Sequence, residues 1–225
     1  MSLPNLPTPN GSGYTFARVQ PLASMQTSPS LFARPSRQAA LERLDAFCEK
    51  AENYAAERNS DCGSLDADGV SGLSPYLTTR MLTEREVLER VLRQHAFSTV
   101  SKFVDEICWR AYWKGFLEMR PSLWTDYLDE LATEHNRLAQ ENPLEHDYAS
   151  ATSGQTGIDC FDHWVQELIT TGWLHNHTRM WFASIWIFTL KLPWTLGADF
   201  FLRHLLDGDA ASNTLSWRWV AGLHT

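Results

Sequence analysis

The segment Thr171–Ala221 constrains the fold of this chain most strongly, because it joins clusters of polar residues to apolar, tryptophan-rich sequence. The clusters and the tryptophans that follow them comprise His175, Asn176, His177, Arg179, Asp207, Gly208, Asp209, Asn213, Trp217 and Trp219. Acid, amide and guanidinium groups are costly to bury unless they find hydrogen-bonding partners. We therefore expect the segment to surround a ligand that has many hydrogen-bonding edges and a large, flat, apolar face.

The composition allows a large buried core. Hydrophobic residues make up 44% of the 225 residues and there are 10 tryptophans, which is ample for one large domain or two small ones. The formal net charge of −8 opposes nonspecific attraction to nucleic acids and to anionic membranes. Whole-chain charge does not describe a single face, so a local basic groove stays open as an alternative.

The cysteines and the N-terminus favour a cytoplasmic protein. The four cysteines, Cys48, Cys62, Cys108 and Cys160, lie far apart without a CxxC pair. Cys48 and Cys108 fall among apolar helix positions, so we interpret them as reduced core residues. The N-terminus is rich in proline and serine rather than basic and then apolar, so we expect no signal peptide.

The longest apolar run, residues 180–190, is shorter than the ~20 residues that cross a bilayer. We expect it to form a buried helix.

Hydrophobic periodicity favours helices along the chain. Apolar residues recur near every 3.6 positions from a cap at Ser36 to about Arg58, and a capping box at Thr83 and Glu86 begins another helix. Further helices are expected over about 98–117, over 121–141 and from 156 onward, with a loop over 142–155. We therefore predict an all-α fold, with one helical domain over residues 36–225 after an extended, Pro- and Ser-rich arm over 1–35.

The polar clusters also stand in the order of a known family signature, approximately TGWxHNxxRM, then ASF, then LxDGDxAxNxxxWQWxAG. The matching residues are Thr171, Gly172, Trp173, His175, Asn176, Arg179, Met180, Ala183, Ser184, Asp207, Gly208, Asp209, Asn213, Trp217, Trp219, Ala221 and Gly222. The segment thus resembles the FAD-binding half of the photolyase/cryptochrome family, and an isoalloxazine ring is a ligand of the expected shape. The resemblance covers about residues 36–222. It implies a domain without the family's N-terminal α/β antenna domain and last helices.

The resemblance implies noncovalent binding of FAD. Asp207 and Asp209 would accept hydrogen bonds from the flavin imide and the ribityl hydroxyls, Arg179 would pair with Asp207, and Asn213 would face the flavin N5 atom. Backbone amides of the turn at 70–74 would hold the diphosphate, and aromatic residues would flank the adenine. The full implied set is Tyr54, Val70, Ser71, Gly72, Leu73, Ser74, Phe103, Glu106, Arg110, Trp173, Asn176, Arg179, Asp207, Gly208, Asp209 and Asn213.

Several of these residues also have a plainer interpretation. Residues 70–74 can form an ordinary Ser/Gly turn, and Val70 replaces a family threonine, which removes one hydroxyl contact. Asp207-Gly208-Asp209 can simply cap a helix. Glu106 and Arg110 are one helical turn apart and could form a surface ion pair. These alternatives stay open at the level of the sequence.

The resemblance also implies residues for light-driven electron transfer. A light-excited flavin is a strong oxidant, and Trp217 and Trp194 stand where the family has its first two donor tryptophans, although Trp194 could equally be a core residue. A distal donor has no clear counterpart, and the alternatives are Trp124, Trp181 and Tyr148. The residues that resemble the family's pocket for a pyrimidine dimer are Glu106, Trp109, Asn176, Met180 and Trp219.

Two function classes follow from the resemblance, and a third is weaker. The chain could be a deoxyribodipyrimidine photolyase-like carbon–carbon lyase that acts on UV-damaged DNA. It could instead be a photoreceptor or redox module that acts through a homodimer or a protein partner. A helical scaffold without flavin is the third alternative. The spacing of His175 and His177 differs from that of a helical zinc pair, so we expect no metal.

Overall fold

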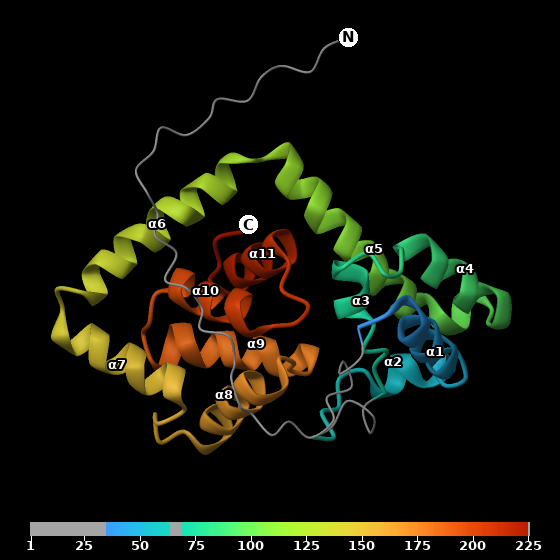
Figure 1. The fold of residues 1–225 in the computed structure, drawn as a ribbon, viewed down its shortest axis with the longest axis horizontal. Helices are drawn as coiled ribbons and strands as arrows, with labels where there is room; N and C mark the ends of the chain where they lie inside the picture. The colour runs from blue at the N-terminus through green and yellow to red at the C-terminus, as the bar shows by residue number, and fades with distance from the viewer. Residues whose placement is uncertain (1–34, 64–68, 225) are drawn as a thin grey trace, which may run out of the picture.

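The computed structural model describes residues 35–63 and 69–224, and every regular element in these ranges is a helix (Figure 1). The all-α prediction is therefore confirmed. Almost all of the arm predicted over 1–35 lies outside the described residues, so that prediction stays untested. Within the described part of the chain, no helix is both long and apolar enough to cross a membrane.

The N-terminal helices form a small group that begins with α1 (Arg37–Cys48). Ser36 caps α1 as expected, since its hydroxyl oxygen accepts a hydrogen bond from the Ala39 N–H at 3.1 Å. The predicted continuous helix to Arg58 is wrong, because α1 ends at Cys48 and is followed by a 3-10 turn, η1 (Ala51–Asn53), and by α2 (Tyr54–Glu57). Phe47, Ala51 and Tyr54 nevertheless bury their side chains in the same core.

Three further helices complete this group. They are α3 (Ser74–Thr78), α4 (Glu84–Gln94) and the long α5 (Phe97–Met119). The capping box that begins α4 is present, with Thr83 and Glu86 each bonded to the other's backbone N–H, so that prediction is confirmed. The first half of α5 packs on α2 and α4 and contributes Val100, Phe103 and Ile107 to the smaller of two hydrophobic cores. Cys48 is buried as expected, but the core assignment of Cys108 on α5 is wrong, because its side chain is exposed.

The remaining helices form a larger group around the second core. Their bounds are α6 (Ser122–Leu138), α7 (Asn142–Ser153), α8 (Asp159–Thr171), α9 (Asn176–Ser184), the π-helical turn η2 (Ile185–Thr189), α10 (Trp194–His204) and α11 (Ala210–Val220). The run at 180–190 is therefore the end of α9 plus η2 rather than one buried helix, and Phe188 is 55% exposed.

Helix α7 replaces the loop predicted over 142–155. Pro143 stands in its first turn, where proline is tolerated, and Gly154 ends it with a left-handed φ of 64°. Leu144 and Tyr148 pack on the larger core, and this tertiary contact stabilises a helix whose own sequence is mostly polar.

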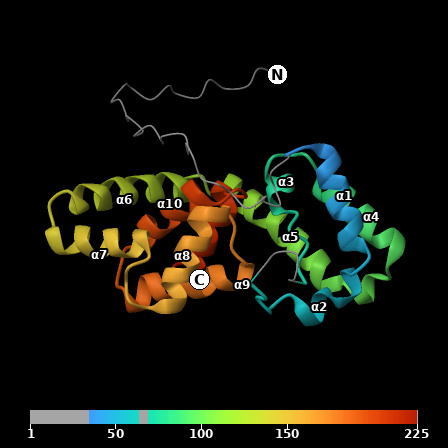
Figure 2. The same ribbon diagram turned by 60° about the horizontal axis from the view of Figure 1, so that its bottom comes forward.

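The two groups lie on either side of the second half of α5, as Figures 1 and 2 show. Helix α5 leaves the small group, and α6 continues it as an arch over the centre of the larger one, where α9, α10 and α11 pack together. The two cores are thus connected by one long helix, and α11 contacts that helix directly. This arrangement leaves the facing sides of α5, α9 and α11 free to line a site.

Candidate functional site

A cavity of about 720 Å³ lies where the two groups of helices meet. Arg58, Glu106 and Trp109 line it from the small group, and residues of α9, α10 and α11 line it from the large group. Its volume falls within the roughly 300–1,000 Å³ of pockets for small molecules and cofactors. Its walls combine charged groups with flat aromatic rings, which is the character expected from the sequence.

The first turn of α9 supplies a polar wall of this cavity. His175 caps the helix, with its Nδ1 atom accepting a hydrogen bond from the His177 N–H at 3.1 Å, and Asn176 and Met180 line the cavity. Arg179 donates to both carboxylate oxygens of Asp207, at 3.1 and 3.0 Å, and to the Leu174 carbonyl at 3.0 Å. The expected pairing of Arg179 with Asp207 is confirmed.

Asp209 fixes the start of α11 and carries a charge at the cavity wall. One carboxylate oxygen accepts from the Ser212 N–H at 3.0 Å, and the other lies 3.0 Å from the Lys114 ammonium and 3.8 Å from the Arg110 guanidinium. Burial opposes ionisation of Asp209, but the Ser212 N–H, Lys114 and Arg110 together lower its pKa below the ordinary value. The carboxylate is thus held charged and aimed by the helix terminus.

Helix α11 presents one face to the cavity. Asp209, Ser212, Asn213, Ser216 and Trp217 all line it, and their spacing of three and four residues places them on one side of the helix. The buried Asn213 amide donates from Nδ2 to the Ala198 carbonyl at 2.8 Å, which fixes the orientation of the amide. The Ser212 hydroxyl is buried without a hydrogen-bond partner in the described part of the chain, so a ligand in the cavity could supply one.

Glu106 and Arg58 form an ion pair at the opposite wall. The Arg58 guanidinium lies 2.6 Å from the Glu106 carboxylate, and both side chains line the cavity. Burial raises the pKa of Glu106 above its ordinary value even though Arg58 opposes the change. The alternative of a surface pair between Glu106 and Arg110 is wrong, because Arg110 instead contacts Glu84 and Asp209.

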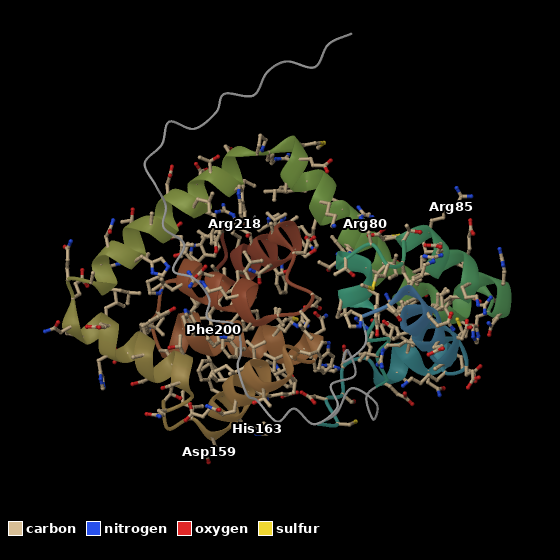
Figure 3. All side chains as sticks on the ribbon, in the orientation of Figure 1. Arg80, Arg85, Asp159, His163, Phe200 and Arg218 are labelled. Atoms are coloured by element: carbon tan, nitrogen blue, oxygen red, sulfur yellow. The ribbon has the colours of Figure 1, made fainter. Side chains whose placement is uncertain are left out.

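Aromatic rings form the mouth of the cavity. Trp109 on α5 and Trp219 on α11 are each 51% exposed, and Trp113 stacks on Trp109 with ring centroids 5.7 Å apart. Figure 3 shows how densely side chains fill the surrounding helices, with Arg218 on α11 and Phe200 on α10 in the larger group. The sequence interpretation missed Tyr112, Trp113 and His224, although one helical turn separates Trp113 from Trp109.

Some residues assigned from the sequence lie outside the cavity lining. Tyr54 and Phe103 contact each other in the small core at 5.3 Å between ring centroids, and burial and the charge of Glu106 raise the pKa of Tyr54. Trp173 is 8% exposed with its ring against His175. Arg110 approaches the site through Asp209 and through a 2.8 Å hydrogen bond to Thr78.

The turn at 70–74, which the resemblance assigns to the diphosphate, leads into α3, and none of its residues is among those that line the cavity. The Arg43 guanidinium donates to the Ser71 carbonyl at 2.8 Å, and the Ser71 hydroxyl accepts from the Leu73 N–H at 3.3 Å. Gly72 has a φ of 61°, and a Cβ atom there would lie 2.5 Å from the Arg43 guanidinium, so the position favours glycine. Helix α3 is tied to the site by Thr78, which donates to the Asp207 carbonyl at 3.2 Å.

The tryptophans assigned to electron transfer lie in the larger core. Trp217 lines the cavity and is 2% exposed, whereas Trp194 packs against Tyr127 with ring centroids 5.6 Å apart. Trp217 contacts a further tryptophan, Trp186, that the sequence interpretation did not single out. Trp186 is fully buried on η2.

The residues present fit a flavin nucleotide better than a metal. The cavity offers carboxylates, an oriented amide, an unpartnered hydroxyl and aromatic faces, which together suit a flat ring with polar edges. Among residues 35–63 and 69–224, no group of three or more His, Cys, Asp and Glu side chains is placed to hold a metal ion.

Comparison with protein families places this arrangement among known domains. The family described as the FAD binding domain of DNA photolyase matches residues 103–225. A deoxyribodipyrimidine photo-lyase of Salmonella typhimurium is 32% identical over 201 residues, which cover 83% of this chain and 39% of that protein. One from Streptomyces griseus is 35% identical over 162 residues, which cover 72% of this chain and 34% of that protein.

Solved structures agree with the sequence relatives. A class III photolyase from Agrobacterium tumefaciens matches 83% of this chain and 38% of its own, with a TM-score of 0.69 and 29% identity. A cryptochrome from Synechocystis matches 84% of this chain and 39% of its own, with a TM-score of 0.66 and 26% identity. The chain thus spans about two fifths of the length of these relatives. It belongs to the photolyase/cryptochrome family and is built as the family's helical FAD-binding domain, whose cofactor is FAD.

Proposed function

We propose that this chain holds FAD noncovalently in the cavity between α5, α9 and α11 and uses it for light-driven electron transfer. The cavity volume and the polar groups on its walls support this proposal. Asp207 and Asp209 accept hydrogen bonds from the ring and the ribityl chain, Asn213 faces the ring, and the turn at 70–74 holds the diphosphate beside Arg43. The bidentate Arg179–Asp207 pair fixes the orientation of the aspartate.

The same residues define what the protein contributes to the chemistry. FAD, when bound, supplies a light-absorbing ring that exchanges single electrons. Trp217 lies at the cavity wall and is positioned to give an electron to that ring. Trp194 is assigned to the same task as a more distant donor.

We infer that the substrate is a cyclobutane pyrimidine dimer in UV-damaged DNA, which would make the chain a photolyase-like carbon–carbon lyase. The observation that carries this inference is that Glu106, Trp109, Asn176, Met180 and Trp219 line one cavity. Trp109 and Trp219, half exposed at the mouth, would stack on the flipped-out bases, and Asn176 would bond a base edge. Glu106, at the same wall, would help to hold and steady the dimer.

A blocking substitution tests FAD binding in this cavity. Ser216 lines the cavity on α11, and its side chain is exposed there, so Ser216→Trp would fill the space without disturbing the core. Flavin-free wild-type protein should bind one FAD per chain in a calorimetric titration, and Ser216→Trp should lose this binding. The matched control is Ser98→Trp, at an exposed position in the first turn of α5 and away from the cavity. Equal binding by both variants would refute the assignment.

Photoreactivation tests the repair function. Purified protein with reduced FAD should remove cyclobutane dimers from a UV-irradiated oligonucleotide under blue light and not in the dark. Trp109→Ala should lower repair far more than it lowers FAD binding, because Trp109 stands at the mouth. A flavin-loaded protein that leaves dimers intact would reject the lyase and leave FAD binding in place.

A second function is favoured by the aromatic face of α5. Tyr112, Phe116 and Met119 follow Trp109 on this helix, and Met119 is 74% exposed, which is typical of a surface that contacts another protein. We propose as the alternative a flavin photoreceptor or redox module that acts through a homodimer or a protein partner. Light scattering of flavin-loaded protein before and after illumination tests it. An unchanged monomer in both states would count against it.

A further inference from the structure

Side chains from distant parts of the sequence hold the two groups of helices together. The two hydrophobic cores are built from different buried residues, and α5 joins the groups by its contact with α11 and its ion pairs to Asp209. A hydrogen bond also connects α9 with the segment that follows α2. The Thr178 hydroxyl donates to the Asp61 carboxylate at 2.5 Å, across 117 positions of the chain.

This hydrogen bond lies beside the cavity. The chain just before Asp61 lines the cavity through Arg58, which belongs to the small group. On the other side, the residues that flank Thr178 on α9, His177 and Arg179, line it from the large group. The Asp61–Thr178 contact therefore joins the wall that carries Arg58 to the wall that carries Arg179.

The Thr178 hydroxyl is used differently from other threonine hydroxyls in these helices. Several donate to a carbonyl of their own helix four residues earlier, at 2.8–2.9 Å: Thr133, Thr152 and Thr171. For Thr178 that carbonyl belongs to Leu174, and it accepts from the Arg179 guanidinium. A local bond is the usual choice for a threonine within a helix. The completely buried Thr178 instead reaches Asp61 in the other group.

The Asp61 carboxylate is held ready for this contact. Its second oxygen accepts from the Gly63 N–H at 2.9 Å, which fixes the turn after α2. Thr178 stands in the first turn of α9, where the backbone dipole favours a negative charge. Asp61 is exposed, so water can take the place of Thr178 when the bond breaks. The contact is thus favourable when made and can reopen without leaving a buried charge.

We propose that the Asp61–Thr178 hydrogen bond is a clasp that closes the cavity and opens when FAD enters or leaves. The inference rests on the proposed function, because it takes FAD as the ligand of this cavity. Helix α5 runs from one group to the other and serves as the hinge (Figure 1). When the clasp opens, the wall that carries Arg58 separates from α9. The clasp forms in the empty and in the loaded protein, so it governs the rates of FAD exchange rather than the affinity.

Two substitutions break the clasp, one from each side. Thr178→Val removes the hydroxyl and keeps the branched shape, and Asp61→Ala acts at an exposed position, so it should fold as wild type does. Stopped-flow flavin fluorescence measures FAD binding to flavin-free protein. The association and dissociation rate constants should both rise by roughly tenfold, the weight of one hydrogen bond to a charged group. The dissociation constant should stay nearly unchanged. The control, Thr152→Val, removes a hydroxyl bonded within α7 and should leave both rates at their wild-type values.

The double variant makes the test specific. Because both substitutions break the same hydrogen bond, their combination should give the rates of either single variant rather than the product of the two effects. Faster dissociation with unchanged association would mean that these residues contact FAD directly, and it would overturn the clasp. Wild-type rates in both single variants would do the same. FAD binding with either result refutes the clasp alone. A protein that binds no FAD refutes the clasp and the proposed function together.

Discussion

Single residues around the cavity are held by paired charges, and these pairs determine how the site responds to substitution. Arg179 and Asp207 form a bidentate pair in which the Asp207 side chain is 4% exposed. The Asp209 carboxylate accepts a hydrogen bond from the N-terminus of α11 and pairs with the Lys114 and Arg110 side chains. In both cases the removal of one partner leaves a charge that is shielded from water. The resulting decrease in the free energy of unfolding is larger than the decrease caused by breaking an exposed ion pair.

Arg179→Ala should lower the free energy of unfolding by about 3–5 kcal/mol, because it leaves the buried Asp207 carboxylate without its partner. Urea denaturation followed by circular dichroism measures the change. The control is Arg85→Ala, which removes an arginine with 86% side-chain exposure from a surface pair with Glu89 and should change stability by less than about 0.5 kcal/mol. Equal losses in the two variants would show that the Arg179 pair is not buried in solution.

Asp209→Asn tests the charge at the start of α11, since asparagine still caps a helix. The pKa of Asp209 is lowered from 3.8, so its ionised form stabilises the fold above pH 3.8, and this contribution is lost as the pH falls through the lowered value. Wild type should exceed the variant by roughly 1–3 kcal/mol at pH 7, and the two should converge in acid. Urea denaturation at several pH values measures the difference. A difference that stays unchanged however far the pH falls below 3.8 would contradict the assignment.

At the scale of elements, the helices bring one face each to the site. The i, i+3 and i, i+4 spacing of Glu106, Trp109 and Trp113 on α5 and of Asp209, Asn213 and Trp217 on α11 fixes which side chains line the cavity. Helix α10 supports α11 from behind, and Gly197 is the point of closest approach. A Cβ atom there would lie 2.3 Å from the Trp217 ring and 2.9 Å from the Trp186 indole nitrogen.

Gly197→Ala should therefore destabilise the protein by about 1–3 kcal/mol through overpacking, and it should displace the Trp217 ring. The matched control is Gly115→Ala in α5, where a Cβ atom meets nothing within 4 Å. That substitution should stabilise the helix by about 0.5–1 kcal/mol. Thermal unfolding and tryptophan fluorescence measure both effects. A neutral Gly197→Ala would mean that α10 and α11 pack less closely than the structure shows.

Elements were predicted correctly from the sequence where local signals are strong. They were missed where tertiary contacts determine whether a helix or a side-chain contact forms. The capping box at Thr83 follows from residue type and spacing, the Arg179–Asp207 pair follows from the family resemblance, and both are present. Helix α7 was missed because its sequence is mostly polar, and its packing on the larger core through Leu144 and Tyr148 is a tertiary contact that no local pattern reveals. Trp186 was missed because its contact with Trp217 joins separate elements, which no local pattern reveals.

At the scale of the whole molecule, the cavity joins two hydrophobic cores. Arg58 and Glu106 belong to the small group, and Arg179, Asp207 and Asn213 belong to the large one. A ligand that contacts both walls stabilises both groups at once, because it binds the folded state and not the unfolded chain. The sequence resemblance predicted the site as a set of residues, whereas its location at the junction of two cores emerges only from the fold.

FAD should therefore protect both groups from unfolding. At a free concentration 100 times its dissociation constant, it should add about 2.7 kcal/mol to the stability of the chain. Hydrogen exchange should slow at the amides of α1 and α4 as well as at those of α9 and α11. Protection of the large group alone would mean that Arg58 and Glu106 do not contact the ligand.

The most direct test of the account is the absorption spectrum of protein purified in the dark, supplemented with FAD, passed through a desalting column and then illuminated with blue light. The account predicts a yellow protein with about one flavin per chain, whose oxidised-flavin absorption bleaches under illumination because Trp217 supplies an electron. A chain that leaves the column folded but colourless would contradict it.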